Sequence, residues 1–134
     1  MSTPILVLDP ISSVPPYEQI GSQIRLQIAT GHLLPGAMLP SVRQLAHDLG
    51  VAPNTVVRAY SELENEGWVT TTARRGVFIA SPSPTQVAKV RAQQFEQAVI
   101  QLLVTAHQMG VTPVQIHAEI DRLLNAFPPL DSRR

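Results

Sequence analysis

Residues 39–60, which read LPSVRQLAHDLGVAPNTVVRAY, decide the fold of this chain. Ser41 and Gln44 have the spacing of a capping box, in which each side chain bonds the other residue's backbone amide. This spacing predicts that a helix begins directly after Ser41. Gly50 supplies the left-handed conformation that ends such a helix. Pro53 suits the first position of a second helix, where its missing N–H costs nothing. The pattern therefore predicts two short helices joined by a tight turn, a helix-turn-helix.

The second of these helices has two chemically different faces. Its apolar face consists of Val56, Ala59, Tyr60 and Leu63, which recur at helical spacing. A rotation of about 100° per residue places Asn54, Arg58 and Ser61 opposite that face, with Thr55 at its edge. The major groove of DNA accommodates such a row of amide, guanidinium and hydroxyl groups, although many solvated helices also carry one.

The flanking residues complete a larger unit. Apolar residues at steps of three and four within residues 16–31 predict an earlier helix that packs over the other two. Residues 68–72 and 77–79 favour two β-strands around a turn at 73–76, and together they form a wing. Residues 5–8 are compatible with a short edge strand. The whole pattern predicts a winged helix-turn-helix.

The order and spacing of these segments resemble the GntR-type bacterial transcription regulators, whose N-terminal domain is a winged helix-turn-helix. The resemblance extends over residues 10–80 and is carried by residues 17–20, 31–36, 39–43, 53–60 and 63–68. Residues 53–60, PNTVVRAY, are similar to the YtrA subfamily in particular. The resemblance implies a cytoplasmic, sequence-specific regulator, more often a repressor, that binds double-stranded DNA and, as in YtrA-like members, often controls a transporter operon.

The resemblance also implies which side chains contact DNA. The set comprises Arg43, Asn54, Thr55, Arg58, Ser61, Arg74, Arg75 and Gly76. Arg58 and Arg43 are expected on a phosphate or a guanine edge, and Arg75 is expected to enter the minor groove from the wing tip. Two alternatives stay open: a surface ion pair between Arg43 and Asp48, and a backbone hydrogen bond of Thr55.

Three positions depart from the family pattern. Ala52 stands where many GntR proteins have a hydroxyl residue as the N-cap, and Pro53 stands where they have an arginine. Val57 occupies a position that often holds a second arginine, and its side chain suits a thymine methyl group instead. The operator sequence of the wider family therefore does not carry over to this chain.

A different pattern follows the proline-containing linker at residues 81–84. From residue 85 the apolar residues step by four and three as in a coiled coil, Gly110 interrupts them, and Thr112 with Pro113 begins another helix. Two antiparallel helices are too small to bury their apolar stripes, which favours a homodimer. YtrA-like members also dimerise through such a tail. The residues expected at the dimer interface are Phe95, Val99, Leu102, Leu103, Ala106, Ile116, Ile120, Leu123, Leu124 and Phe127. The alternative is that the tail folds onto its own winged domain.

The chain is thus predicted to be mainly α with a small β-wing (α+β). A winged helix-turn-helix at 1–80 precedes a linker at 81–84 and a helical dimerisation domain at 85–134, which is also the candidate effector domain. A dimer of this kind places two recognition helices about 34–36 Å apart, which matches an inverted repeat on one face of DNA. His117 and Asp121 lie one helical turn apart and, with His107, are weak candidates for a metal-responsive site. Nothing in the sequence identifies a small-molecule effector.

Composition excludes several other classes of protein. The 134 residues include no cysteine and no apolar run of the length that a membrane span needs, so neither a disulfide nor a membrane partner is expected. No phosphate-binding glycine loop or triad spacing occurs, so neither an enzyme activity nor a cofactor is expected. Ten basic and ten acidic residues give a net charge of zero, whereas DNA-binding domains are usually basic. A winged helix that docks a protein partner is therefore the rival interpretation.

Overall fold

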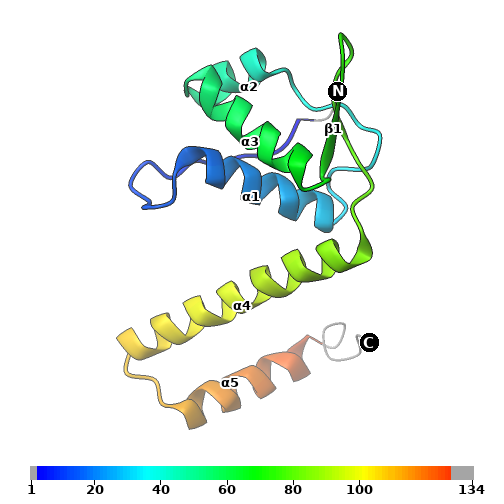
Figure 1. Ribbon diagram of the computed structural model, residues 1–134. Coiled ribbons are helices and arrows are strands. Elements are labelled where there is room, and N and C mark those ends of the chain that lie inside the picture. Colours follow the sequence, from blue (N-terminus) through cyan, green and yellow to red (C-terminus); the bar gives the residue numbers. More distant parts are fainter. Residues whose placement is uncertain (1–2, 128–134) are drawn as a thin grey trace. The chain divides into compact units, whose positions relative to one another are not determined.

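The protein is a helical chain with one small sheet, seen in a computed structural model that describes residues 3–127 (Figure 1). In chain order the elements are α1 (Pro16–Ala29), α2 (Val42–Leu49), α3 (Pro53–Asn65), β1 (Val69–Thr72), β2 (Gly76–Ile79), α4 (Pro84–Gln108) and α5 (Pro113–Ala126). The chain divides into two compact units between Gln94 and Phe95, so that α4 contributes to both. These elements confirm the predicted fold class.

The core of the first unit is built on the apolar face of α3. Val56 and Leu63 of α3 are completely buried, as are Ile20 and Ile24 of α1, which packs against α3. Tyr60 is also buried, and its hydroxyl donates to the Pro40 carbonyl at 2.8 Å. Burial raises the pKa of Tyr60 well above its ordinary value, so the hydroxyl keeps the proton that it donates. The same hydrogen bond ties α3 to the segment that leads into α2.

The start of α2 differs in one detail from the predicted capping box. Ser41 caps the helix as expected, because its Oγ accepts the Gln44 amide at 3.1 Å. The predicted reciprocal bond, from the Ser41 amide to the Gln44 side chain, is wrong. The Gln44 side chain donates to the Asp48 carboxylate at 2.8 Å instead. Asp48 lies one turn further along the same face, and a charged acceptor makes a stronger hydrogen bond than a neutral one.

The N-terminal arm, residues 3–9, is extended but is not the predicted edge strand. Each of three glutamines on α1 both donates to and accepts from one residue of the arm, at N–O distances between 2.7 and 3.2 Å. The pairs are Gln27 with Ile5, Gln23 with Val7 and Gln19 with Asp9. Two residues of extended chain span about 6.6 Å and four residues of helix about 6 Å, so the spacings match. Side chains of a helix thus replace a neighbouring strand.

The wing is an antiparallel pair in which Val69 faces Ile79 and Thr72 faces Gly76. Gly76 therefore belongs to β2 rather than to the turn, and β1 begins one residue after Trp68. Residues 36–39 lie along the other edge of β2, where the Leu39 amide donates to the Val77 carbonyl at 2.8 Å. Residues 36–39, and not the N-terminal arm, therefore lie beside the wing.

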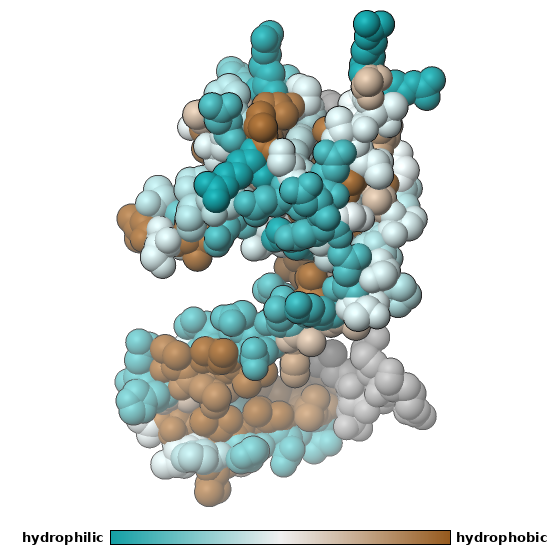
Figure 2. Space-filling model, in the orientation of Figure 1, coloured by the Kyte–Doolittle hydropathy of each residue, from teal (hydrophilic) through white to brown (hydrophobic). Residues whose placement is uncertain are grey.

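The second unit is a helical hairpin. Gly110, with a φ of 72°, follows α4, and Thr112 and Gln115 form a complete capping box at the start of α5. The two helices line an apolar groove of about 240 Å³. Apolar side chains gather over α4 and α5 in Figure 2, and many of them are exposed. The predicted pair of antiparallel helices is confirmed (Figure 1).

Substitution Tyr60→Phe tests the bond between α3 and the entry to α2. Removal of the hydroxyl leaves the buried Pro40 carbonyl without its donor, and we expect the free energy of unfolding to fall by about 1–2 kcal/mol. Thermal unfolding of the purified protein measures this change. Tyr17→Phe is the matched control, because the Tyr17 hydroxyl is not buried. Equal stabilities of the two variants would contradict the structural role of Tyr60.

Candidate nucleic-acid interface

The helix-turn-helix leaves the polar face of α3 open to solvent. Gly50 ends α2 with a φ of 69°, and the Val51 amide donates to the Ala46 carbonyl at 3.1 Å, which closes the turn. No side chain caps α3, because its N-cap is Ala52 and Pro53 occupies its first position. The predicted contact residues on α3 are Asn54, Arg58 and Ser61, which are exposed, and Thr55, which is half-buried.

Arg58 is held by two neighbours in the folded protein. Its Cζ lies 3.8 Å from the centre of the Tyr17 ring on α1. Its Nε lies 3.5 Å from a carboxylate oxygen of Glu62, one turn along α3. The Arg58 side chain nevertheless stays 61% exposed, so these contacts do not remove it from solvent. The sequence placed Tyr17 in the family motif and on the apolar stripe of the first helix, but its contact with Arg58 could not be foreseen, because that contact depends on how α1 crosses α3.

Arg43 projects from the first turn of α2 and is exposed. Asp48, its alternative partner, accepts a hydrogen bond from Gln44. Within residues 3–127 the structure contains no ion pair of Arg43, so the Arg43–Asp48 pair is not formed. Its guanidinium is available to a ligand outside the chain.

The wing tip presents two arginines on a tight turn. The Arg75 amide donates to the Thr72 carbonyl at 3.0 Å, and both Arg74 and Arg75 are exposed. Arg74 has a φ of 65°, the single positive value for a residue other than glycine in the described part of the chain. This conformation costs an ordinary residue about 1 kcal/mol or more. An arginine at a position that glycine would fill more easily points to a role for its charge.

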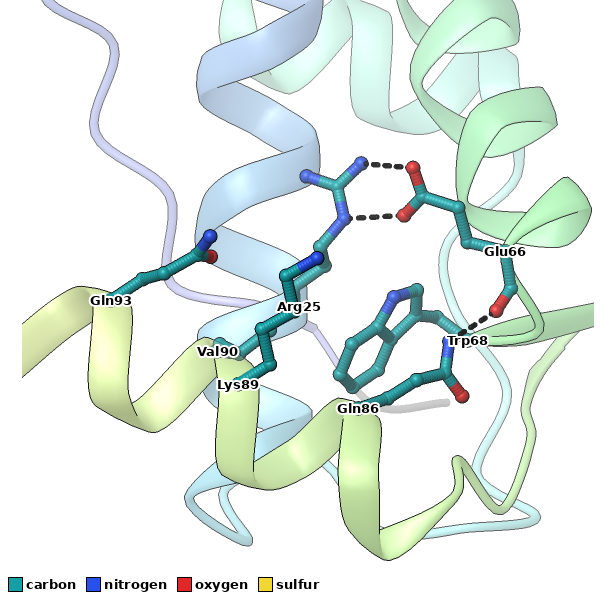
Figure 3. A pocket seen from close by; sticks show the side chains of 7 residues that line it. All are labelled: Arg25, Glu66, Trp68, Gln86, Lys89, Val90 and Gln93. Carbon is teal, nitrogen blue, oxygen red and sulfur yellow. Dashed lines mark hydrogen bonds and ion pairs between the residues drawn. The ribbon is translucent and has the colours of Figure 1, made fainter.

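A cavity of about 500 Å³ lies where α4 leaves the winged unit (Figure 3). The Arg25 guanidinium forms two bonds to the Glu66 carboxylate, at 2.7 and 3.3 Å, and Trp68 lies between this pair and α4. The Gln86 side chain donates to the Glu66 carbonyl and accepts the Ser83 amide at 3.2 Å. Because Arg25 and Gln86 both bond Glu66, the residues around this cavity connect the start of α4 and α1 to the end of α3.

The predicted dimer residues fall into two groups on the second unit. Leu102, Ala106, Ile116, Ile120 and Leu123 line the groove between α4 and α5. Phe95, Val99, Leu103 and Phe127 are exposed, and Leu124 is half-buried. Ile100 and Val104, which the sequence interpretation missed, are exposed beside Leu103 and line a second hollow of about 350 Å³. Their spacing of four residues was the signal that could have revealed them.

The weak metal candidates do not form a site with three ligands. His117 and Asp121 lie one turn apart on α5, and His107 lies near the end of α4. Among residues 3–127, no group of three histidine, aspartate or glutamate side chains is placed to share a metal ion. Within the same residues, no helix has the length and apolarity that a bilayer crossing requires.

Comparisons with known proteins agree with this geometry. Residues 16–79 match the model of the bacterial regulatory proteins of the gntR family. The HTH-type transcriptional repressor YtrA of Bacillus subtilis is 37% identical over 119 residues, which cover 89% of this chain and 92% of YtrA. A GntR family transcriptional regulator from Listeria monocytogenes has a similar structure, with a TM-score of 0.63, 29% identity and coverage of 86% and 98% of the two chains. The DNA-binding domain of AraR, solved in complex with operator ORX1, gives a TM-score of 0.50 at 27% identity, over 60% of this chain and 96% of that one.

A helix-turn-helix with a wing, preceded by a helix that packs on the second of its helices, defines a winged-helix DNA-binding protein. The match in family and in sequence then makes the assignment specific: this chain belongs to the GntR family of transcriptional regulators and is a homologue of YtrA. Its relatives are regulators and not enzymes, as expected from the sequence.

Substitution Arg74→Gly separates the conformational cost of the wing tip from its charge. Glycine adopts a positive φ without strain, so we expect the free energy of unfolding to rise by about 0.5–1 kcal/mol. The same variant loses one cation and should bind DNA more weakly. Thermal unfolding and DNA titration of one protein sample measure both effects. Arg75→Gly serves as the control, because Arg75 has no positive φ to relieve. A loss of stability in Arg74→Gly would show that the turn conformation is not strained.

Proposed function

We propose that this regulator is a cytoplasmic homodimeric repressor that binds an inverted-repeat operator, with a transporter operon as the expected target. The observation that carries the proposal is the exposed polar face of α3 within a winged helix-turn-helix of the GntR family. The AraR domain solved with its operator shows that a domain of this kind can hold DNA. The YtrA repressor aligns along nearly the whole chain and supports the same role here.

The contacts follow from the chemistry of each side chain. Asn54 and Thr55 open α3, where short polar groups meet phosphates and base edges in the major groove. Arg58 and Ser61 extend the row along the helix, and Arg43 reaches a phosphate or a guanine from α2. Val57, which is 44% exposed, suits a thymine methyl group.

The wing supplies contacts outside the major groove. Arg75 at the tip enters the minor groove, Gly76 at the start of β2 lets the tip approach the DNA closely, and Arg74 adds a phosphate contact. Gly76 has a φ of 126°, and a Cβ atom there would come within 3.2 Å of the Met38 sulfur. The glycine therefore lets the wing lie close to the segment before α2.

The homodimer forms through the second unit. Phe95 is 73% exposed and Leu103 is 48% exposed, although both belong to an apolar stripe. Ile100 and Val104 extend this stripe around α4 to a side that α5 does not cover, since the residues of the α4–α5 groove are different ones. A helix that is apolar on most of its circumference is stable in water only when it is covered on more than one side. A second copy of α4 and α5 would supply that cover.

Footprinting across the promoter upstream of the protein's own gene tests DNA binding. We expect a dimer to protect an inverted repeat, with an affinity that falls steeply as salt rises. Arg58→Ala and Arg43→Ala should each weaken binding by roughly tenfold or more and reduce the salt slope where the lost contact is to a phosphate.

The matched control is Arg91→Ala, which removes an exposed arginine from α4 rather than from α2, α3 or the wing. Full affinity in Arg58→Ala and Arg43→Ala would refute the assigned contacts. Absence of protection by the wild-type protein at low salt would refute the regulator's action at this promoter and favour a winged helix that docks a protein.

Substitution Leu103→Asp tests the dimer. Symmetry introduces the carboxylate twice, so each dimer loses two apolar contacts and gains two charges at its interface. We expect the dimer dissociation constant to rise at least about 100-fold, an effect near 3 kcal/mol. Analytical ultracentrifugation over a range of concentrations measures the change.

Gln101→Asp is the control for charge, because Gln101 is an exposed polar residue on the same helix. It should leave the dimer intact. A Leu103→Asp protein that remains a dimer would place the interface elsewhere.

A further inference from the structure

We infer that Tyr17 is a positioning residue for DNA recognition: its ring holds the Arg58 guanidinium in the orientation that meets DNA. This inference rests on the proposed function, in which Arg58 contacts a phosphate or a guanine. Tyr17 lies in the first turn of α1, outside the helix-turn-helix itself. The recognition surface would thus depend on a residue from a third helix.

Part of the Arg58 guanidinium contacts the protein, and the rest is free to contact a ligand. The Arg58 Cζ lies 3.8 Å above the Tyr17 ring, the distance of direct stacking. The Arg58 Nε atom donates to the carboxylate of Glu62, which lies one turn towards the C-terminus, at 3.5 Å. Among residues 3–127, neither terminal nitrogen of Arg58 has a hydrogen-bond acceptor. One face and the inner nitrogen are therefore fixed, while the two terminal nitrogens remain free.

Those two nitrogens are the part of arginine that recognises DNA. They form a planar fork that donates in parallel to two phosphate oxygens, or to the O6 and N7 atoms of guanine. An exposed arginine normally loses much rotational freedom when it binds. Stacking on Tyr17 fixes the plane of the fork before DNA arrives, so less freedom is lost on binding and the contact gains direction.

The alternative is that the stacked pair only fastens α1 to α3. That role makes two different predictions: loss of the Tyr17 ring would lower stability, and it would weaken DNA binding whether or not Arg58 is present. A positioning role acts solely through Arg58. The two roles therefore differ in whether the effects of changing Tyr17 and Arg58 are additive.

A double-mutant cycle with Tyr17→Leu and Arg58→Ala separates them, read out with a labelled duplex of the footprinted promoter. We expect Tyr17→Leu to weaken binding roughly three- to tenfold, the range for one cation–π contact. In the Arg58→Ala background the same change should have no further effect. Tyr17→Phe keeps the ring and should bind as the wild type does. Ser22→Ala, at an exposed residue of α1, controls for disturbance of that helix.

The free protein gives a second readout. The aromatic ring current should shift the NMR signals of the Arg58 δ-methylene protons, and the shift should persist in Tyr17→Phe and vanish in Tyr17→Leu. The unfolding midpoint of each variant shows whether it is folded. Equal weakening by Tyr17→Leu in both backgrounds, or full affinity of Tyr17→Leu, would overturn the positioning role. Full affinity of Arg58→Ala alone would instead overturn the proposed DNA contact, so the two failures are distinguishable.

Discussion

Burial of one face of α3 is the constraint on which the winged unit depends. Val56 and Leu63 lie on this face without solvent contact, and α1, α2 and β1 all contact α3. A helix of 13 residues is marginal by itself in water, so its stability comes from this packing. Because helical geometry fixes the opposite face once the first is buried, the outward direction of Arg58 follows from the core. The hydrogen bond from the Tyr60 hydroxyl to the Pro40 carbonyl also fixes the rotation of α3 about its own axis, since only one rotation of the helix brings the two groups together.

A second constraint acts at the far end of the same helix. The C-cap residue of α3 is Glu66. Its carboxylate accepts from Arg25 of α1, and its backbone carbonyl accepts from Gln86 of α4 (Figure 3). Gln86 also accepts the Ser83 amide, so it belongs to the N-terminal cap of α4. Its side chain therefore joins the end of the recognition helix to the beginning of the helix that carries the exposed apolar stripe. Val87 and Val90 pack against the winged core, and the first turns of α4 act as part of the winged unit rather than as a free tether.

The parts of the fold that could be predicted from the sequence are those specified by local chemistry. Ser41 with Gly50 bounds α2, and Thr112 with Gln115 starts α5, because caps and left-handed glycines act within a few residues. The parts that could not be predicted join distant residues. Gln19, Gln23 and Gln27 form a visible row on α1, but their partners are backbone atoms of the arm. The same holds for the candidate site: the outward row on α3 follows from helical rotation, whereas the contact between Tyr17 and Arg58 requires the crossing of α1 and α3.

The zero net charge of the chain is compatible with DNA binding because the charges are separated and differently engaged. Glu62 and Glu64 lie in the C-terminal half of α3, and Glu66 is its C-cap residue. Their carboxylates accept from Arg58, the Thr71 amide and Arg25 respectively. In the described part of the chain, Arg43, Arg74 and Arg75 form no ion pair. Exposed charges are screened within about 8 Å at physiological salt, so DNA responds to the groups next to it and not to the sum over the molecule. Arg43 in the first turn of α2 and Arg74 and Arg75 at the wing tip therefore place exposed positive charge where DNA is proposed to bind, while the total charge sets only the weak attraction at long range.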